Sequence, residues 1–82
     1  MNVSEQGVPK PQSRFLMDLR DGEEGIIRVN GDRKSTEMGL FPGARVVMFR
    51  NRKSERSMVI GAGDARFLVS RVIAQQVEVE DK

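Results

Sequence analysis

The side chains in this chain of 82 residues that could do chemistry are carboxylates and cations, because histidine, cysteine, tyrosine and tryptophan are all absent. Without His and Cys, the chain cannot assemble a Ser–His–Asp or Cys–His catalytic group, and it lacks the nitrogen and sulfur ligands that zinc prefers. We therefore expect a protein that is not an enzyme and that requires no cofactor.

Carboxylates are the only ligands left for a metal ion. They lie near the expected first turn, on the expected helix and at the end of the chain, and the weak metal candidates are Asp21, Glu23, Glu24 and Glu37. Oxygen ligands can hold ferrous iron, although weakly and with little selectivity. Because Asp-Gly is typical of a solvated turn, we favour a turn over a metal site here, and we expect any Fe²⁺ binding to be weak.

A basic segment from Arg45 to Arg56 contains five bases and one acid, a local charge of +4 in a chain whose net charge is only +2. Four of these bases lie in or beside the expected hairpin loop 51–57: Arg50, Arg52, Lys53 and Arg56. Three roles are open for this basic loop. It could be a solvated loop that protects a strand edge, a docking site for an acidic protein surface, or a phosphate site in nucleic acid or anionic lipid.

Aromatic side chains help to choose among these roles, because nucleic-acid-binding barrels present stacking rings beside their positive charge. The chain offers only four phenylalanines. We expect Phe49 and Phe67 in the core, within strands, and only Phe41 exposed. Stable nucleic-acid binding is therefore not expected.

From Phe15 onward, short apolar segments alternate with breaks that contain Gly, Asn or Asp, a pattern typical of a small all-β domain. The predicted strands are 25–29, 44–50, 58–60, 66–70 and 76–80. One short helix is predicted over Arg33–Met38, between an Asp32 N-cap and a terminating Gly39, and a helical turn over 71–74. We predict a mainly β fold, a small SH3-like barrel of about five strands with one short helix. An OB-like barrel is the alternative.

The folded domain is expected to span residues 15–82. Residues 1–14 contain two of the three prolines and only isolated apolar residues, so we expect a flexible N-terminal tail. The longest strictly apolar run is Val46–Phe49, far short of the roughly 18 residues that a membrane-spanning helix needs. The sequence predicts neither a membrane span nor a signal peptide, and we expect a cytoplasmic protein.

Several short motifs occur in an order and spacing that resembles the FeoA family. These motifs are Leu19-x-x-Gly22-x-x-Gly25-x-Ile27, Gly39-Leu40-x-Pro42-Gly43, Ala65-Arg66-Phe67-Leu68-Val69-Ser70-Arg71-Val72-Ile73-Ala74 and Val77-x-Val79. FeoA is the small cytosolic partner of the FeoB ferrous-iron transporter. The same SH3-like module forms the C-terminal domain of DtxR-type iron- and manganese-dependent repressors. The resemblance covers about Phe15 to Glu80.

The resemblance implies a non-enzymatic regulatory protein that binds the cytoplasmic part of a FeoB-like GTPase transporter and influences its nucleotide cycle or assembly. We expect the contact surface to be an exposed apolar patch of Met38, Leu40 and Phe41 beside the basic loop. A nucleic-acid-binding barrel that uses the basic loop and a weak metal-responsive module are the alternatives. A free strand edge also makes a homodimer conceivable.

The chain departs from the family pattern in two places. Family members usually carry a leucine pair where this chain has Ser35-Thr36, so the short helix here either packs more loosely or covers something other than a hydrophobic core. Members also commonly carry a Gly-Asp-Pro-like turn in the region of the basic loop.

Overall fold

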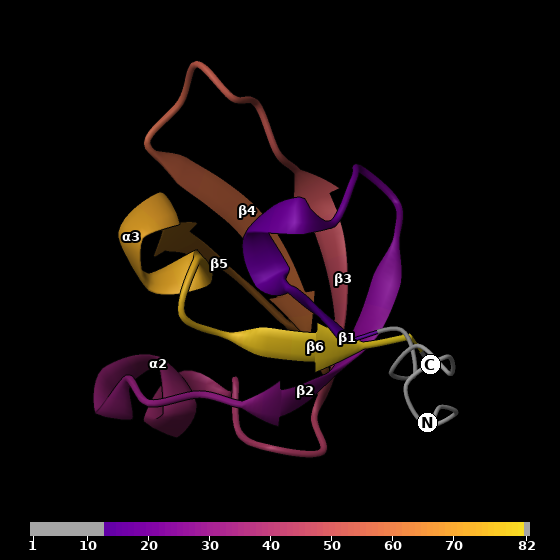
Figure 1. Cartoon of the computed structure of the whole chain (residues 1–82), viewed down its shortest axis with the longest axis vertical. Helices are drawn as coiled ribbons and strands as arrows, with labels where there is room; N and C mark the ends of the chain where they lie inside the picture. Colours follow the sequence, from indigo (N-terminus) through magenta and orange to yellow (C-terminus); the bar gives the residue numbers. More distant parts are fainter. Residues whose placement is uncertain (1–12, 82) are drawn as a thin grey trace, which may run out of the picture.

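The computed structural model describes residues 13–81, which form one antiparallel sheet of six strands with three short helical segments. The strands are β1 (Ser13–Phe15), β2 (Glu24–Val29), β3 (Arg45–Arg50), β4 (Ser57–Ala62), β5 (Ala65–Ser70) and β6 (Glu78–Glu80). The helical segments are η1 (Leu16–Asp18), α2 (Arg33–Met38) and α3 (Arg71–Ala74). The sheet order is β1-β6-β2-β3-β4-β5, and Figure 1 shows β6 crossing in front of β3 and β4 as the sheet curls.

The sheet curls around a single apolar core, because alternate residues of each strand point to the same side. In β3, Val46 and Met48 are buried, and in β4 Met58 and Ile60 are buried. The other core side chains come from the remaining elements and from the segments that join them: Leu16, Leu19, Ile27, Leu40, Ala44, Val69, Ala74, Val77 and Val79. The predicted mainly β, SH3-like architecture is confirmed.

The predicted helix is confirmed from Arg33 to Met38 with both of its caps. The Asp32 carboxylate accepts a 2.8 Å hydrogen bond from the Ser35 N–H, which satisfies one of the free donors of the first turn. Gly39 ends the helix at φ 136°, a conformation that side chains with a Cβ disfavour. The predicted helical turn over 71–74 is α3.

The departure at Ser35 replaces apolar packing by hydrogen bonds. Ser35 is the buried polar residue of the described chain, with 5% of its surface exposed. Its Oγ accepts a 2.9 Å hydrogen bond from Asn30 Nδ2, which also donates to the Leu40 carbonyl at 3.0 Å. Asn30 Oδ1 in turn accepts from the Asp32 N–H at 2.9 Å. The short helix is thus tied to the barrel by a polar network centred on Asn30.

The strands differ from the prediction mainly at one edge of the sheet, where β1 and β6 lie. Six strands form where about five were expected, because β1 pairs with β6 through Ser13↔Glu80 and Phe15↔Glu78. Ser13 and Arg14 therefore belong to the sheet, although the prediction placed them in the tail; the rest of that predicted tail, residues 1–12, lies outside the described residues. The last strand begins at Glu78 instead of residue 76. No helix within residues 13–81 is long and apolar enough to span a bilayer.

Candidate functional site

The basic loop, residues 51–56 in the structure, joins β3 to β4 at one end of the barrel, uppermost in Figure 1. Asn51 fastens this loop to the segment between η1 and β2. Its side-chain amide donates to the carbonyls of Met17 at 2.9 Å and Leu19 at 2.7 Å, and its backbone N–H donates to Asp21 Oδ1 at 2.8 Å. Three hydrogen bonds from one residue hold the start of the loop in a fixed position.

Arg71, the first residue of α3, holds the other side of the loop. Its Nε donates to the Glu55 carbonyl at 3.1 Å, and its Nη2 donates to the Arg52 carbonyl at 2.6 Å and to Asn51 Oδ1 at 3.0 Å. Its backbone N–H donates to the Arg56 carbonyl at 2.7 Å. All of these acceptors are neutral, so the guanidinium orders the loop without an ion pair to a described carboxylate.

Two of the four predicted bases in and beside the loop are neutralised by carboxylates. Arg50 forms a two-point ion pair with Glu55, at 3.0 Å from Nε and 2.7 Å from Nη2, and this hydrogen bonding lowers the pKa of Glu55. Arg52 pairs with Asp21, and that contact, with the Asn51 N–H, lowers the pKa of the Asp21 carboxyl. The segment therefore presents less net charge than its count of bases suggests.

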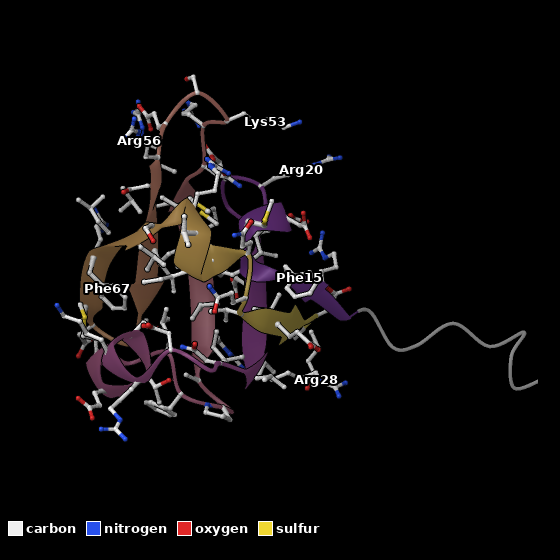
Figure 2. The ribbon with its side chains drawn as sticks, turned by 60° about the vertical axis from the view of Figure 1, so that its left-hand side comes forward. Phe15, Arg20, Arg28, Lys53, Arg56 and Phe67 are labelled. Carbon is white, nitrogen blue, oxygen red and sulfur yellow. The ribbon has the colours of Figure 1, made fainter. Side chains whose placement is uncertain are left out.

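Lys53 and Arg56 are exposed and make no ion pair or side-chain hydrogen bond with any described residue. Figure 2 shows both at the loop end of the barrel, with Arg20 from the neighbouring turn at the same end. A groove of about 640 Å³ runs between that turn and the loop. Its lining residues are Met17, Asp18, Leu19, Arg20, Asp21, Asn51, Arg52, Lys53 and Arg71. We call Arg20, Lys53 and Arg56 the basic end.

The predicted apolar contact patch does not form as expected. Leu40 is fully buried, because its N–H closes the end of α2 on the Ser35 carbonyl at 2.9 Å and its side chain then enters the core. Met38 and Phe41 are exposed, at 49% and 51%. They belong to α2 and the segment after it, at the opposite end of the barrel from the basic loop in Figure 1. A partner role for Met38 and Phe41 stays a prediction.

The prediction that only Phe41 among the phenylalanines is exposed is wrong, because Phe15 and Phe49 are also exposed, at 41% and 43%. Phe41 is exposed and Phe67 packs partly buried against the core, both as expected. Phe49, expected in the core, is 43% exposed, because it follows Met48 at an irregularity in the β3–β4 register and turns to the outer face. Its ring lies over Gly61 and beneath Arg66, whose guanidinium carbon is 4.0 Å from the ring centre. The outer face there holds a second hollow of about 510 Å³.

The four candidate metal ligands are not gathered into one site. Asp21 is engaged by Arg52. Glu23 accepts from the Arg20 N–H at 2.6 Å, which lowers the pKa of that carboxyl, and it forms an ion pair with Arg14 at 3.5 Å. Glu24 lies in β2 opposite Val47, and Glu37 lies on α2. Within residues 13–81 no three acidic side chains come close enough to hold a metal ion. Weak binding of Fe²⁺ by any of these carboxylates stays a prediction.

The sequence matches the FeoA domain family over residues 15–81. The chain belongs to the FeoA family. A crystal structure described as an iron uptake regulatory protein, FeoA, is similar over 84% of this chain and 96% of that one, with 25% identity and a TM-score of 0.76. No curated protein sequence matches the chain.

Two structures of manganese-dependent transcriptional repressors, one in complex with manganese, share the fold. Their TM-scores are both 0.79, at 21% and 23% identity over 96% and 92% of this chain. The FeoA-family chain spans 47% and 39% of those repressors, so it corresponds to one module of each. Membership of the FeoA family makes this a small protein associated with ferrous iron transport.

Proposed function

We propose that this FeoA-family protein is a non-enzymatic, cytoplasmic accessory protein that binds the cytoplasmic part of a FeoB-like ferrous-iron transporter through its basic end. By this contact it influences the nucleotide cycle or the assembly of that GTPase. The observation that carries the proposal is a loop that is held from both sides, while the side chains of Lys53 and Arg56 make no ion pair or hydrogen bond with a described residue.

Rigidity supports a binding role because an ordered loop loses less conformational entropy when a partner docks. Six hydrogen bonds hold the loop: two from the Asn51 side chain, one from the Asn51 N–H and three from the Arg71 side chain. A loop that served only as a solvated cap on a strand edge would not need to be held so firmly. The exposed cations complement an acidic protein surface, and such charges raise the association rate and set specificity.

An acidic protein surface fits this end better than nucleic acid does. Single strands are bound where aromatic rings stack on bases beside the positive charge. Phe41 belongs to the segment after α2, and α2 lies at the opposite end of the barrel from the basic loop (Figure 1). The guanidinium carbon of Arg66 lies 4.0 Å from the centre of the Phe49 ring. Among the described residues, the groove at the basic end is lined by no aromatic side chain.

Calorimetric titration of the purified transporter cytoplasmic domain with the full chain tests the proposal. The double variant Lys53→Glu and Arg56→Glu changes the charge of the basic end by four units and should weaken binding at least about tenfold at 0.1 M salt. The matched control is Arg33→Glu with Lys34→Glu, the same charge change on exposed residues of α2 at the other end. The control should bind like the original chain.

Equal weakening by both double variants would show that only net charge matters and would remove the basic end from the interface. No binding of the original chain at any salt concentration would overturn the proposed partner. The same variants titrated with a single-stranded oligonucleotide distinguish the alternative, because tight binding that falls steeply with salt would assign the basic end to nucleic acid.

A further inference from the structure

The edge of the sheet at β5 is long and regular, whereas the other edge is short. β5 pairs only with β4 in the described sheet, and its register is unbroken over six residue pairs from Ser57↔Ser70 to Ala62↔Ala65. The other edge strand, β1, has three residues, and its Arg14 forms ion pairs with Glu23 and Asp81. Within residues 13–81, only β5 is an edge strand of ordinary length that could pair with another chain.

The hairpin between β4 and β5 fixes which backbone groups of β5 point outward. Gly63, at φ 63°, and Asp64 form a two-residue turn, so Ala62 and Ala65 are a hydrogen-bonded pair. Hydrogen-bonded and non-hydrogen-bonded pairs alternate along an antiparallel ladder. The N–H and C=O groups of Arg66 and Leu68, and the N–H of Ser70, therefore face away from β4. No described backbone group outside the strands pairs with them.

Leu68 lies at the middle of this edge and is the most exposed of the large apolar side chains in the described chain, at 68%. It sits on the outer face, in register with Val59 of β4. β5 contains no proline, no lysine and no bulge, which are the usual devices that keep an edge strand from pairing.

The only charge on β5 is directed away from the edge. Arg66 pairs with Gly61 across the ladder, and its guanidinium reaches over that glycine to the Phe49 ring on β3. A side chain at position 61 would block this arrangement, because a Cβ there would lie 2.3 Å from Phe49 Cε2. Because position 61 is a glycine, the Arg66 guanidinium can lie over the Phe49 ring, away from the β5 edge, and that edge stays apolar.

We propose that β5 pairs with β5 of a second copy of this chain, antiparallel and about a two-fold axis at Leu68. That register joins Leu68 to its own copy by two backbone hydrogen bonds and packs the two leucines side by side on the outer face. It also sets Arg66 opposite Ser70, so no like charges meet. This self-complementarity favours a second copy over an unrelated strand.

Sedimentation velocity of the full chain over a range of concentrations tests this proposal without any transporter. Because an edge contact is small, we expect a dissociation constant on the order of 10–100 µM. Leu68→Lys, on a side chain that is already exposed, should raise this constant about tenfold or more. Met38→Lys, an equal charge change on α2, should leave it unchanged.

Mild oxidation provides a test of the register, since the chain has no cysteine of its own. Leu68→Cys should give a disulfide-linked dimer in high yield, and Met38→Cys should not. A chain that stays monomeric at about 1 mM, a dimer equally sensitive to Leu68→Lys and Met38→Lys, or equal cross-linking of the two cysteine variants would each overturn the proposal.

Discussion

Arg71→Gln should be among the most damaging single substitutions outside the apolar core, although its side chain is only half-buried. The guanidinium donates three hydrogen bonds to neutral acceptors in the basic loop. A hydrogen bond to a charged group contributes roughly 1.5–3 kcal/mol where it is buried. Water can reach the freed loop carbonyls, so we place the total loss at about 2–3 kcal/mol rather than at the sum of three full bonds.

For a domain of this size, that loss corresponds to a fall in the melting temperature of roughly 10–20 °C. Thermal and urea unfolding followed by circular dichroism measures it, and amide hydrogen exchange should show faster exchange in residues 51–56. Arg56→Gln is the matched control, because Arg56 makes no ion pair or side-chain hydrogen bond with a described residue and should change the stability by less than about 0.5 kcal/mol. If the two variants are equally stable, Arg71 does not hold the loop and the rigid-loop reasoning fails.

Three other predictions follow from the packing and the charges. Gly61→Ala should lower the free energy of unfolding by about 1–2 kcal/mol because the added Cβ would displace the Phe49 ring, and this loss should be smaller in a Phe49→Ala background. A double-mutant cycle by urea unfolding measures both losses, and additive losses would contradict the prediction. Ser35→Ala removes an acceptor of Asn30 and should lower the free energy of unfolding by about 1–2 kcal/mol, whereas an unchanged urea midpoint would show that this bond is dispensable. The hydrogen bond from Arg52 holds the folded-state pKa of Asp21 below its ordinary value of 3.8, so the stabilisation from this carboxylate is present above about pH 4 and is lost as the pH falls through the folded-state pKa. Between pH 7 and pH 2 the melting temperature of Asp21→Asn should therefore fall less steeply than that of the original chain, and identical slopes would show that the Asp21–Arg52 contact does not stabilise the fold.

The sequence predicts the local elements of this fold well, because their signals are local. Asp32 and Gly39 bracket α2, and the alternation of apolar residues marks β3 and β4. β1 was not predicted, since Ser13–Phe15 carries no strand pattern of its own. It is extended because β6, more than sixty residues later in the chain, pairs with it. Long-range pairing of that kind has no local signature.

The candidate site was predicted only in part, for a related reason. The sequence locates the basic loop, but it does not show that Asp21 and Glu55 neutralise two of its arginines. Arg71 belongs to one of the family motifs, but nothing in the neighbouring sequence indicates that its side chain reaches the carbonyls of Arg52 and Glu55. Leu40 was assigned to an exposed apolar patch with Met38 and Phe41, whereas the end of α2 directs its side chain into the core.

The two proposals place constraints on each other. In one copy, the basic loop lies at the end of β5 that carries Ser70, because the loop leads into Ser57 and Ser57 pairs with Ser70. In an antiparallel β5–β5 dimer, the Ser70 ends of the two strands point in opposite directions. The two basic ends of the dimer therefore face away from each other. A transporter domain held at a membrane can engage only the end that faces it, so a dimer docks through one copy at a time. If both proposals hold, a Leu68→Lys monomer and the original dimer should bind the transporter domain with the same affinity per basic end. Loss of transporter binding in the monomer would instead mean that the second copy contributes to the docking surface.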